Sequence, residues 1–218
     1  DSDLDVLVVS EDDNSVFWYR NDGSPANGGW NKYTIASNLT AAISVHAADI
    51  DGDDDIDVVA AGFTADDVVW YVNDGSPAGD NWTAVVIDGD FDGARMVRAV
   101  DLDGDDNIDV VAAGNEADDV SWWLNDGSPT GPNWTEYSID NNFNGAVSIN
   151  VGDFDGDGDK DVIAGSDGTD GLRWWMSDGT PTAGWIERVV YDPTSNAYIL
   201  DLESGDIDGD GDLEILAA

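Results

Sequence analysis

Short apolar segments alternate along the whole chain with joints rich in Gly, Asp, Asn and Pro. No segment has helical periodicity, and the apolar segments are rich in the residue types that favour β-strands. Each unit contains four such segments, for which the clearest examples are Ala94–Val100, Asp109–Gly114, Val68–Val72 and Trp82–Ile87. The second segment carries almost no charge. The third is apolar at both its odd and its even positions, whose side chains face opposite sides of a sheet, so both segments should be covered on two faces. The pattern predicts an all-β fold of four-stranded units.

The unit recurs about every 52 residues, as two columns of tryptophan show. The columns are Trp18, Trp70, Trp122 and Trp174, and Trp30, Trp82, Trp134 and Trp185. The predicted phases are 1–41 (partial), 42–93, 94–145, 146–197 and 198–218 (partial), within a single repeat array spanning 1–218. Four-stranded units that repeat and pack on both faces are typical of β-propeller blades. Both ends of the chain supply the second strand of a unit, so we expect a window from a longer array.

An acidic loop joins the first and second strands of each unit. Its first complete copy is Asp49-Ile50-Asp51-Gly52-Asp53-Asp54-Asp55-Ile56-Asp57, and it returns at 101–109, 153–161 and 206–214. Carboxylates at alternate positions place several hard oxygens around one point, which suits Ca²⁺. Without a cation, about five like charges would lie within a Debye length of roughly 8 Å. An EF-hand does not fit, because neither flank is helical. The loops therefore predict Ca²⁺ as the cofactor.

The motif Asp-x-Asp-Gly-Asp-x-Asp-x-Asp, followed by an apolar strand and Trp-aromatic-x-Asn-Asp-Gly, resembles the FG-GAP and VCBS-type repeats. These repeats form integrin α-subunit propellers and occur in many secreted bacterial and archaeal proteins. The resemblance covers nearly the whole chain and implies side-chain ligands at loop positions one, three, five and nine. These are Asp49, Asp51, Asp53 and Asp57; Asp101, Asp103, Asp105 and Asp109; Asp153, Asp155, Asp157 and Asp161; and Asp206, Asp208, Asp210 and Glu214.

The same resemblance implies that loop position seven binds the ion through its backbone carbonyl. Position seven is occupied by Asp55, Asn107, Asp159 and Asp212, and a partial loop at the start of the chain contributes Asp1, Asp3 and Asp5. The chain departs from the family in its short repeat and in Glu214, which replaces the usual Asp and has a longer arm.

The chain has 48 acidic and 7 basic residues, a net charge of −41. Such a field repels nucleic acids and anionic membranes, so no nucleic-acid partner is expected. No run of 18 apolar residues is present, which argues against membrane insertion. The absence of cysteine excludes a disulfide framework. The acidic excess also suits a high-salt setting, because surface carboxylates keep a protein hydrated.

The tryptophans and the single histidine can each be interpreted as structural or as functional residues. The tryptophans could form a sugar-binding platform, but their strict periodicity inside strands favours a packed core. His46, the single histidine, shares a repeat position with Arg98, Asn150 and Glu203 on the first strand. A propeller's first strand lines its axis, so varied polar side chains are expected there. No serine or cysteine recurs with His46, and we expect no catalytic residues.

The connector Asp88–Gly93 differs from its equivalents at 140–145 and 37–41. It joins the fourth strand to the next first strand, on the face opposite the acidic loops. In integrins, which the chain resembles, that face carries ligand contacts. We therefore keep two interpretations, a polar connector and a docking site for another protein or a glycan. The sequons Asn38-Leu39-Thr40, Asn81-Trp82-Thr83 and Asn133-Trp134-Thr135 make the chain a candidate glycoprotein.

Together these patterns predict an extracellular or cell-surface calcium-binding β-propeller repeat module that is not an enzyme. Its role would be structural, adhesive or ligand-binding. Two alternatives remain open. The first is a propeller of a polysaccharide-active enzyme, either catalytic or accessory. The second is a self-associating subunit of a surface filament, since open-ended repeats can stack from molecule to molecule.

Overall fold

The computed structural model describes residues 3–78, 82–128, 134–193 and 198–218. Within them the chain forms five antiparallel sheets in chain order, together with the short 3₁₀ helix η1 (Pro25–Asn27). The first sheet has three strands and the last has two, and the three between them have four each. The strands are β1 (Val6–Ser10), β2 (Ser15–Asn21) and β3 (Trp30–Ala36); β4 (Ala42–Ala48), β5 (Asp57–Gly62), β6 (Asp67–Val72) and β7 (Thr83–Asp88); β8 (Ala94–Val100), β9 (Asp109–Gly114), β10 (Asp119–Leu124) and β11 (Thr135–Asp140); β12 (Ala146–Gly152), β13 (Asp161–Ser166), β14 (Leu172–Met176) and β15 (Ile186–Tyr191); and β16 (Leu202–Gly205) and β17 (Glu214–Ala217).

The all-β prediction and the four-stranded unit are confirmed. The predicted strands Ala94–Val100 and Asp109–Gly114 are β8 and β9 with the same bounds. The other two example strands differ by one residue at an end, since β6 begins at Asp67 and β7 covers Thr83–Asp88. In each sheet the strands pair in chain order, so every connection inside a sheet joins two neighbouring antiparallel strands.

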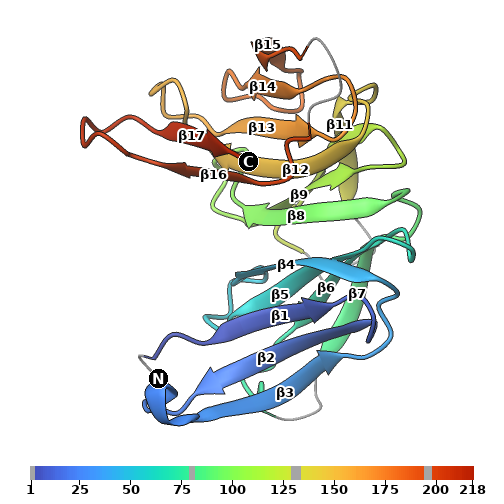
Figure 1. Cartoon of the computed structure of the whole chain (residues 1–218), viewed down its shortest axis with the longest axis vertical. Coiled ribbons are helices and arrows are strands. Elements are labelled where there is room, and N and C mark those ends of the chain that lie inside the picture. Colours follow the sequence, from blue (N-terminus) through green and yellow to red (C-terminus); the bar gives the residue numbers. More distant parts are fainter. Residues whose placement is uncertain (1–2, 79–81, 129–133, 194–197) are drawn as a thin grey trace.

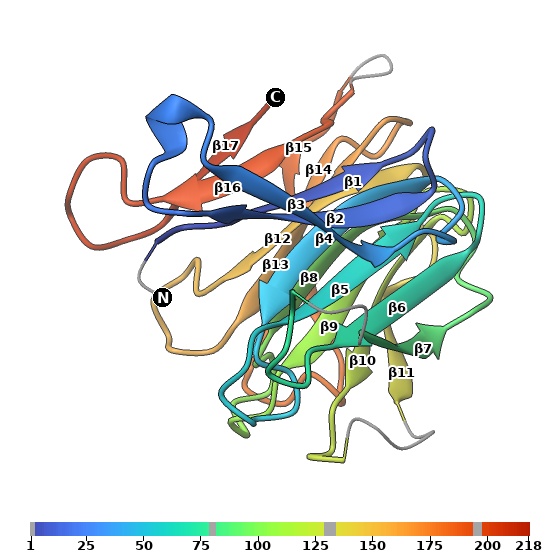
Figure 2. The same ribbon diagram turned by 90° about the horizontal axis from the view of Figure 1, so that it is seen from below.

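Consecutive sheets stack face to face (Figures 1 and 2). Their first strands are neighbours, with β4 beside β8, β8 beside β12 and β12 beside β16. The core is consequently a series of interfaces between one sheet and the next. One buried cluster, for example, joins Val59 and Trp70 of the second sheet to Val97, Val110 and Trp123 of the third.

The second strands are buried along their whole length in β5, β9 and β13, as their lack of charge predicts. Their small residues, such as Ala112 and Ala113, let a neighbouring sheet approach closely on each face. The core interpretation of the tryptophans is confirmed at Trp70 and Trp122, which are fully buried. It is wrong at Trp30, the first residue of β3, which is 37% exposed.

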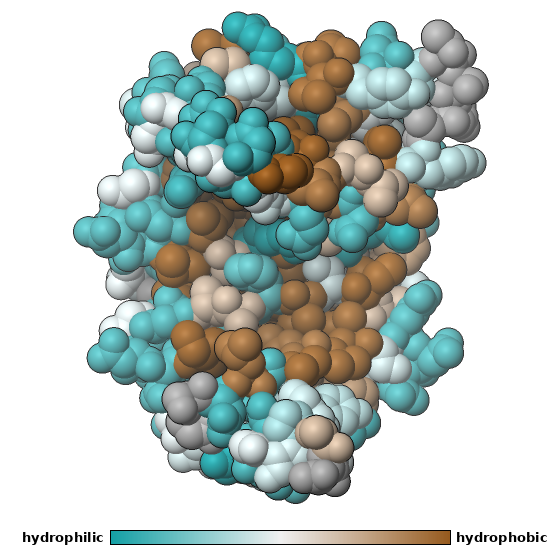
Figure 3. Space-filling view, turned by 60° about the vertical axis from the view of Figure 1, so that its left-hand side comes forward, coloured by the Kyte–Doolittle hydropathy of each residue, from teal (hydrophilic) through white to brown (hydrophobic). Residues whose placement is uncertain are grey.

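Figure 3 shows the side of the molecule on which the acidic loops lie, with hydrophobic residues gathered along its middle and hydrophilic ones at its margins. Loop position two illustrates why exposure varies among the sheets. Ile50 and Leu102 are only 3% and 2% exposed, because the following sheet covers them, whereas Ile207 is 63% exposed.

A recurring hydrogen bond ties the turn between the second and third strands to the connector that enters the next sheet. A residue with positive φ in the turn accepts, through its side-chain oxygen, the backbone N–H of a residue in that connector. Asn14 accepts from Ala41 (2.8 Å), Asp66 from Gly93 (3.0 Å) and Asp118 from Gly145 (2.9 Å). Asn and Asp are the residues other than Gly that tolerate this backbone conformation best.

Replacement of Asp118 tests this contact. Asp118→Ala removes the acceptor and places Ala in a left-handed conformation, so the free energy of unfolding should fall by about 1–2 kcal/mol. Asp118→Asn keeps the acceptor oxygen and reproduces the residue found at position 14, so it should change the free energy by less than about 0.5 kcal/mol. Urea unfolding at fixed calcium concentration measures both. Equal losses in the two variants would show that the hydrogen bond does not stabilise the connector.

Candidate metal centres

The acidic loops connect the first and second strands and lie on one side of the molecule (left in Figure 1). In four of them, three carboxylates each offer one oxygen, and the three oxygens lie within 4.8 Å of one another. The groups are Asp49, Asp51 and Asp53; Asp101, Asp103 and Asp109; Asp153, Asp155 and Asp161; and Asp206, Asp208 and Asp210. Positions one and three therefore come together in every complete loop, joined by position five in two loops and by position nine in the other two.

Local hydrogen bonds shape each loop around this point. In the first complete loop, Asp49 accepts the backbone N–H groups of Gly52 (2.9 Å), Asp53 (3.1 Å) and Asp54 (3.0 Å). Asp53 accepts the N–H of Asp55 (2.9 Å), and the same bond recurs between positions five and seven of the other complete loops. Loop position four is always Gly, with φ between 75° and 82°, which a residue with a Cβ would rarely adopt.

Position three has carboxylate oxygens that lack a partner. Oδ1 of Asp51 and Oδ1 of Asp103 are buried and have no hydrogen-bond donor. Burial, followed by repulsion from the neighbouring loop carboxylates, raises the pKa of both side chains. A buried anionic oxygen without a donor is costly, and a cation among the three carboxylates would satisfy it. The residues present therefore fit a bound metal ion.

Position nine has a second role that its assignment as a ligand did not include. Asp57, Asp109 and Asp161 have no exposed surface, and each accepts two backbone N–H groups. In Asp109, Oδ2 accepts from Leu102 at loop position two (3.1 Å), and Oδ1 accepts from Asn125 in the turn after the third strand (2.8 Å). Glu214 accepts the equivalent N–H of Ile207 (2.8 Å), so its longer arm preserves the contact to the loop.

Burial raises the pKa values of the position-nine carboxylates. It raises the pKa of Asp57 to about 6 and that of Asp109 to about 7, and it also raises the pKa of Asp161. The backbone N–H donors oppose this shift only in part. A nearby cation would act in the same direction as the donors, since it favours the charged form.

The side chain at position seven lies against the Asp-Gly turn in two of the loops, whereas Asn107 donates to the carboxylate of Asp105 (2.9 Å). Asp55 lies against Gly75 of the Asp-Gly-Ser-Pro turn, so closely that a Cβ on that glycine would come within 2.8 Å of its carboxylate. Asp159 lies against Gly179 in the same way, at 2.9 Å. The ligand role of the position-seven backbone carbonyl stays a prediction.

Asn125, which precedes the Asp-Gly turn of the third sheet, connects two separate loops, a role that the sequence analysis missed. The Nδ2 group of Asn125 donates to the carbonyl of Ile108 in its own loop (3.1 Å) and to that of Ile50 in the preceding loop (3.0 Å). The only signal in the sequence was the recurrence of Asn before Asp-Gly at positions 21, 73 and 125.

The partial loop at the start of the chain is described from Asp3 onward, and Asp1 lies outside the described residues. Asp5 has the contacts expected of position nine, because its carboxylate accepts the backbone N–H of Asn21 (2.9 Å) and the Nε1–H of Trp18 (2.9 Å). Asp3 lies near Gly23, as position seven does in the other loops.

The opposite face brings together the acidic turns and the connectors, as expected. Several of the carboxylates there accept hydrogen bonds from backbone or side-chain N–H groups. Asp66 accepts from Gly93, and Asp88 of the Asp88–Gly93 connector accepts the Nε1–H of Trp123 (3.2 Å). The connector is thus at least a structural element. Among the sequons, Asn38 is exposed, whereas Asn81 and Asn133 lie outside the described residues.

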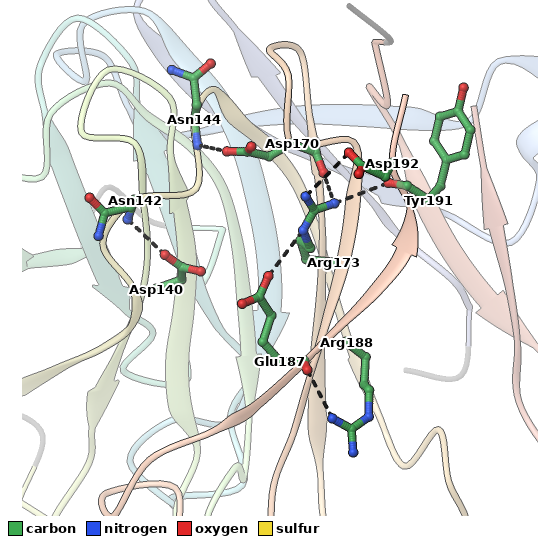
Figure 4. Close-up of polar contacts among 9 residues, drawn as sticks. All are labelled: Asp140, Asn142, Asn144, Asp170, Arg173, Glu187, Arg188, Tyr191 and Asp192. Atoms are coloured by element: carbon green, nitrogen blue, oxygen red, sulfur yellow. Dashed lines mark hydrogen bonds and ion pairs between the residues drawn. The ribbon is translucent and has the colours of Figure 1, made fainter. Parts of the chain in front are cut away.

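Arg173 changes this face in the fourth sheet. Its guanidinium pairs with Glu187 (3.2 Å) and Asp192 (3.8 Å) and donates to the backbone carbonyls of Tyr191 (3.3 Å) and Asp170 (Figure 4). At the equivalent place in the third sheet, Ser121 donates to Glu136 (2.9 Å). Both sheets thus have a contact between the third and the fourth strand, which is a hydroxyl hydrogen bond in the third sheet and an ion pair in the fourth.

Asp119 provides a test of pH dependence away from the loops. Burial raises its pKa to about 6, with Glu136 and Asp140 adding repulsion. The folded chain therefore binds this proton more tightly than the unfolded chain, and that stabilisation is lost as pH rises through about 6. Asp119→Asn should raise the free energy of unfolding at pH 8 by on the order of 1 kcal/mol, after allowance for solvent screening, and have little effect near pH 4. Urea titrations at both pH values measure this, and the same effect at both would refute the electrostatic explanation.

The comparisons with known proteins agree with this architecture. A family model described as FG-GAP-like repeat matches residues 1–60, 101–164 and 153–217. A search of curated proteins found no match to the chain. Among the described residues, no helix is long and apolar enough to cross a membrane. Because the three matches together cover most of the sequence and include all of the acidic loops, the chain belongs to the FG-GAP-like repeat family.

Proposed function

We propose that this chain is an extracellular or cell-surface module of the β-propeller type, stiffened by Ca²⁺ bound in its acidic loops. The observation that carries the proposal is the repeated group of three carboxylates, together with the unpartnered buried oxygens of Asp51 and Asp103. The stacked four-stranded sheets, with first strands side by side, support the propeller part of the proposal, because propeller blades are four-stranded sheets arranged around a central axis.

Calcium suits these loops better than other metals do. The groups offer only oxygen, which disfavours zinc and copper, whose sites use nitrogen or sulfur ligands. The loop residues are also mostly exposed or half-buried, and Ca²⁺ accepts water molecules in its large and irregular coordination shell. Positions one, three, five and nine would bind the ion through side chains and position seven through its carbonyl. A bound ion supplies positive charge that offsets the repulsion among these carboxylates.

The chain's own residues would transmit this stiffening from one sheet to the next. Loop position two inserts Ile50 into the core that the second sheet shares with the third, and Leu102 does the same one sheet later. Asn125 joins the turn of the third sheet to the carbonyl of Ile50. Ordering one loop therefore also orders a contact with the following sheet.

We infer a non-enzymatic role in structure, adhesion or ligand binding. The calcium affinities of extracellular modules, with Kd on the order of 10⁻⁴–10⁻³ M, suit loops that are exposed and locally preorganised. A protein or glycan that docks on the face opposite the loops would have to bring basic groups, because the carboxylate of Asp67 is repelled there by Asp66, Asp88 and Asp90.

Removal of calcium tests the central proposal. One site filled at 100 times its Kd adds about 2.7 kcal/mol to the folded state. For a chain of this size, EGTA should therefore lower the melting temperature by roughly 5–10 °C per site, and excess Ca²⁺ should restore it. Mg²⁺ at the same concentration serves as the control and should restore much less. An unchanged melt in EGTA, with no calcium detected by elemental analysis, would refute the proposal.

A matched pair of variants separates the loop positions. Asp155→Ala removes a side chain of the carboxylate group in the third complete loop, so the chain should bind about one Ca²⁺ ion fewer. Asp159→Ala removes a side chain that faces Gly179 and leaves the backbone carbonyl in place, so calcium stoichiometry should stay unchanged. Equilibrium dialysis against radioactive calcium counts the ions. Equal loss in both variants would contradict the assignment of position seven to a carbonyl.

A further inference from the structure

A cleft of about 450 Å³ lies along the first strands of four consecutive sheets. One polar side chain from each of β4, β8, β12 and β16 lines it, and all four occupy the same repeat position. They are His46, Arg98, Asn150 and Glu203. Because the four groups differ in chemistry, each contributes something different to the cleft.

Arg98 is the cationic group of this cleft. Its Nη1 donates to the carbonyl of the adjacent residue Val97 (3.1 Å). Glu203 and Asp201 attract the guanidinium, but neither carboxylate forms an ion pair with it among the described residues. Burial lowers the pKa of Arg98, although an arginine remains charged at any physiological pH. The cleft thus holds a partly desolvated cation whose remaining N–H donors have no anionic partner in contact.

His46 is oriented to add a second donor. Its Nδ1 accepts the backbone N–H of Ala99 (3.3 Å), which leaves the ring proton on Nε2. Burial and the charge of Arg98 lower its pKa, so the ring is neutral near pH 7. Asn150 is already engaged, since its amide accepts from Val151 (2.8 Å) and donates to Ser204 (3.3 Å). Among the described residues, the guanidinium of Arg98 and the Nε2–H of His46 are therefore free donors of the cleft, with the second Nδ2 proton of Asn150 beside them.

We propose that this cleft binds a small carboxylate, which Arg98 pairs with directly and His46 contacts through its Nε2–H. The planar fork of an arginine matches the two oxygens of a carboxylate, and such charge-assisted hydrogen bonds are stronger in a partly desolvated site. The volume lies in the range of small-molecule sites. Glu203 acts as an internal competitor, because it attracts the same guanidinium without contacting it.

The net charge of the protein narrows the class of ligand further. A net charge of −41 repels polyanions, so a single carboxylate on a small molecule fits better than an acidic polymer. A simple organic acid and an acidic monosaccharide share this chemistry. They differ in the uncharged part of the molecule that carries the carboxylate, which is a sugar ring in the monosaccharide. Acetate and glucuronate therefore serve as probes for the two kinds of ligand.

The single histidine of the chain makes the proposal directly measurable. The NMR signals of the His46 ring are followed at pH 7 and fixed free Ca²⁺ while acetate, glucuronate or glucose is added. Glucuronate should shift them saturably and glucose should not. A similar response to acetate would mean that the carboxylate alone suffices, whereas a response to glucuronate only would show that the sugar ring contributes. No saturable shift with either acid overturns the proposal.

Two variants test the assigned roles. Arg98→Gln removes the charge and should weaken binding about tenfold or more. Glu203→Gln removes the competing charge and should strengthen binding. Unchanged affinity in Arg98→Gln overturns the proposal, as does weaker binding in Glu203→Gln. The calcium-dependent melting shift serves as the folding control, because neither residue lies in an acidic loop. Failure of the carboxylate site would leave that shift intact, and failure of the calcium proposal would abolish it.

Discussion

A buried carboxylate at the start of β5, β9 and β13 connects the acidic loop to the turn after the third strand. In the third sheet, Asp109 accepts one backbone N–H from the acidic loop and one from the turn after the third strand. Both bonds end on a group with no exposed surface, and its pKa is raised to about 7 because burial disfavours its charge. The loop, the turn and the strand between them consequently form one structural unit. A cation in the loop would lower the electrostatic cost of that arrangement.

This unit also reaches into the neighbouring sheet. Loop position two is packed into the next interface, and Asn125 bonds to the carbonyl of Ile50 in the preceding loop. The hydrophobic core is distributed over successive interfaces, and each interface lies next to an acidic loop. In such an array, stability arises from contacts between neighbouring units, so a cation that orders one loop strengthens an interface as well as a site.

The scarcity of cations gives particular weight to the places where they occur. With 7 basic residues against 48 acidic ones, a surface arginine has many exposed carboxylates available as partners. Arg173 uses two of them to join β14 to β15 and to the segment after it. Arg98 instead lies in the cleft along the first strands, where none of the described carboxylates contacts it. That placement costs solvation and is the physical basis of the carboxylate site proposed there.

The sequence alone determined the repeat, the all-β class, the strands β8 and β9, and the acidic loops, because each of these depends on a local pattern or on a fixed spacing. It could not show that position nine also binds backbone groups, that Asp55 faces Gly75, or that Asp118 holds the next connector. Nor could it show that Trp30 stays exposed or what His46 contacts. These features depend on groups that are distant in the chain and meet only when one sheet packs on the next. Tertiary structure decided them, because the cost of burying a charge or an amide is set by the neighbours that surround it.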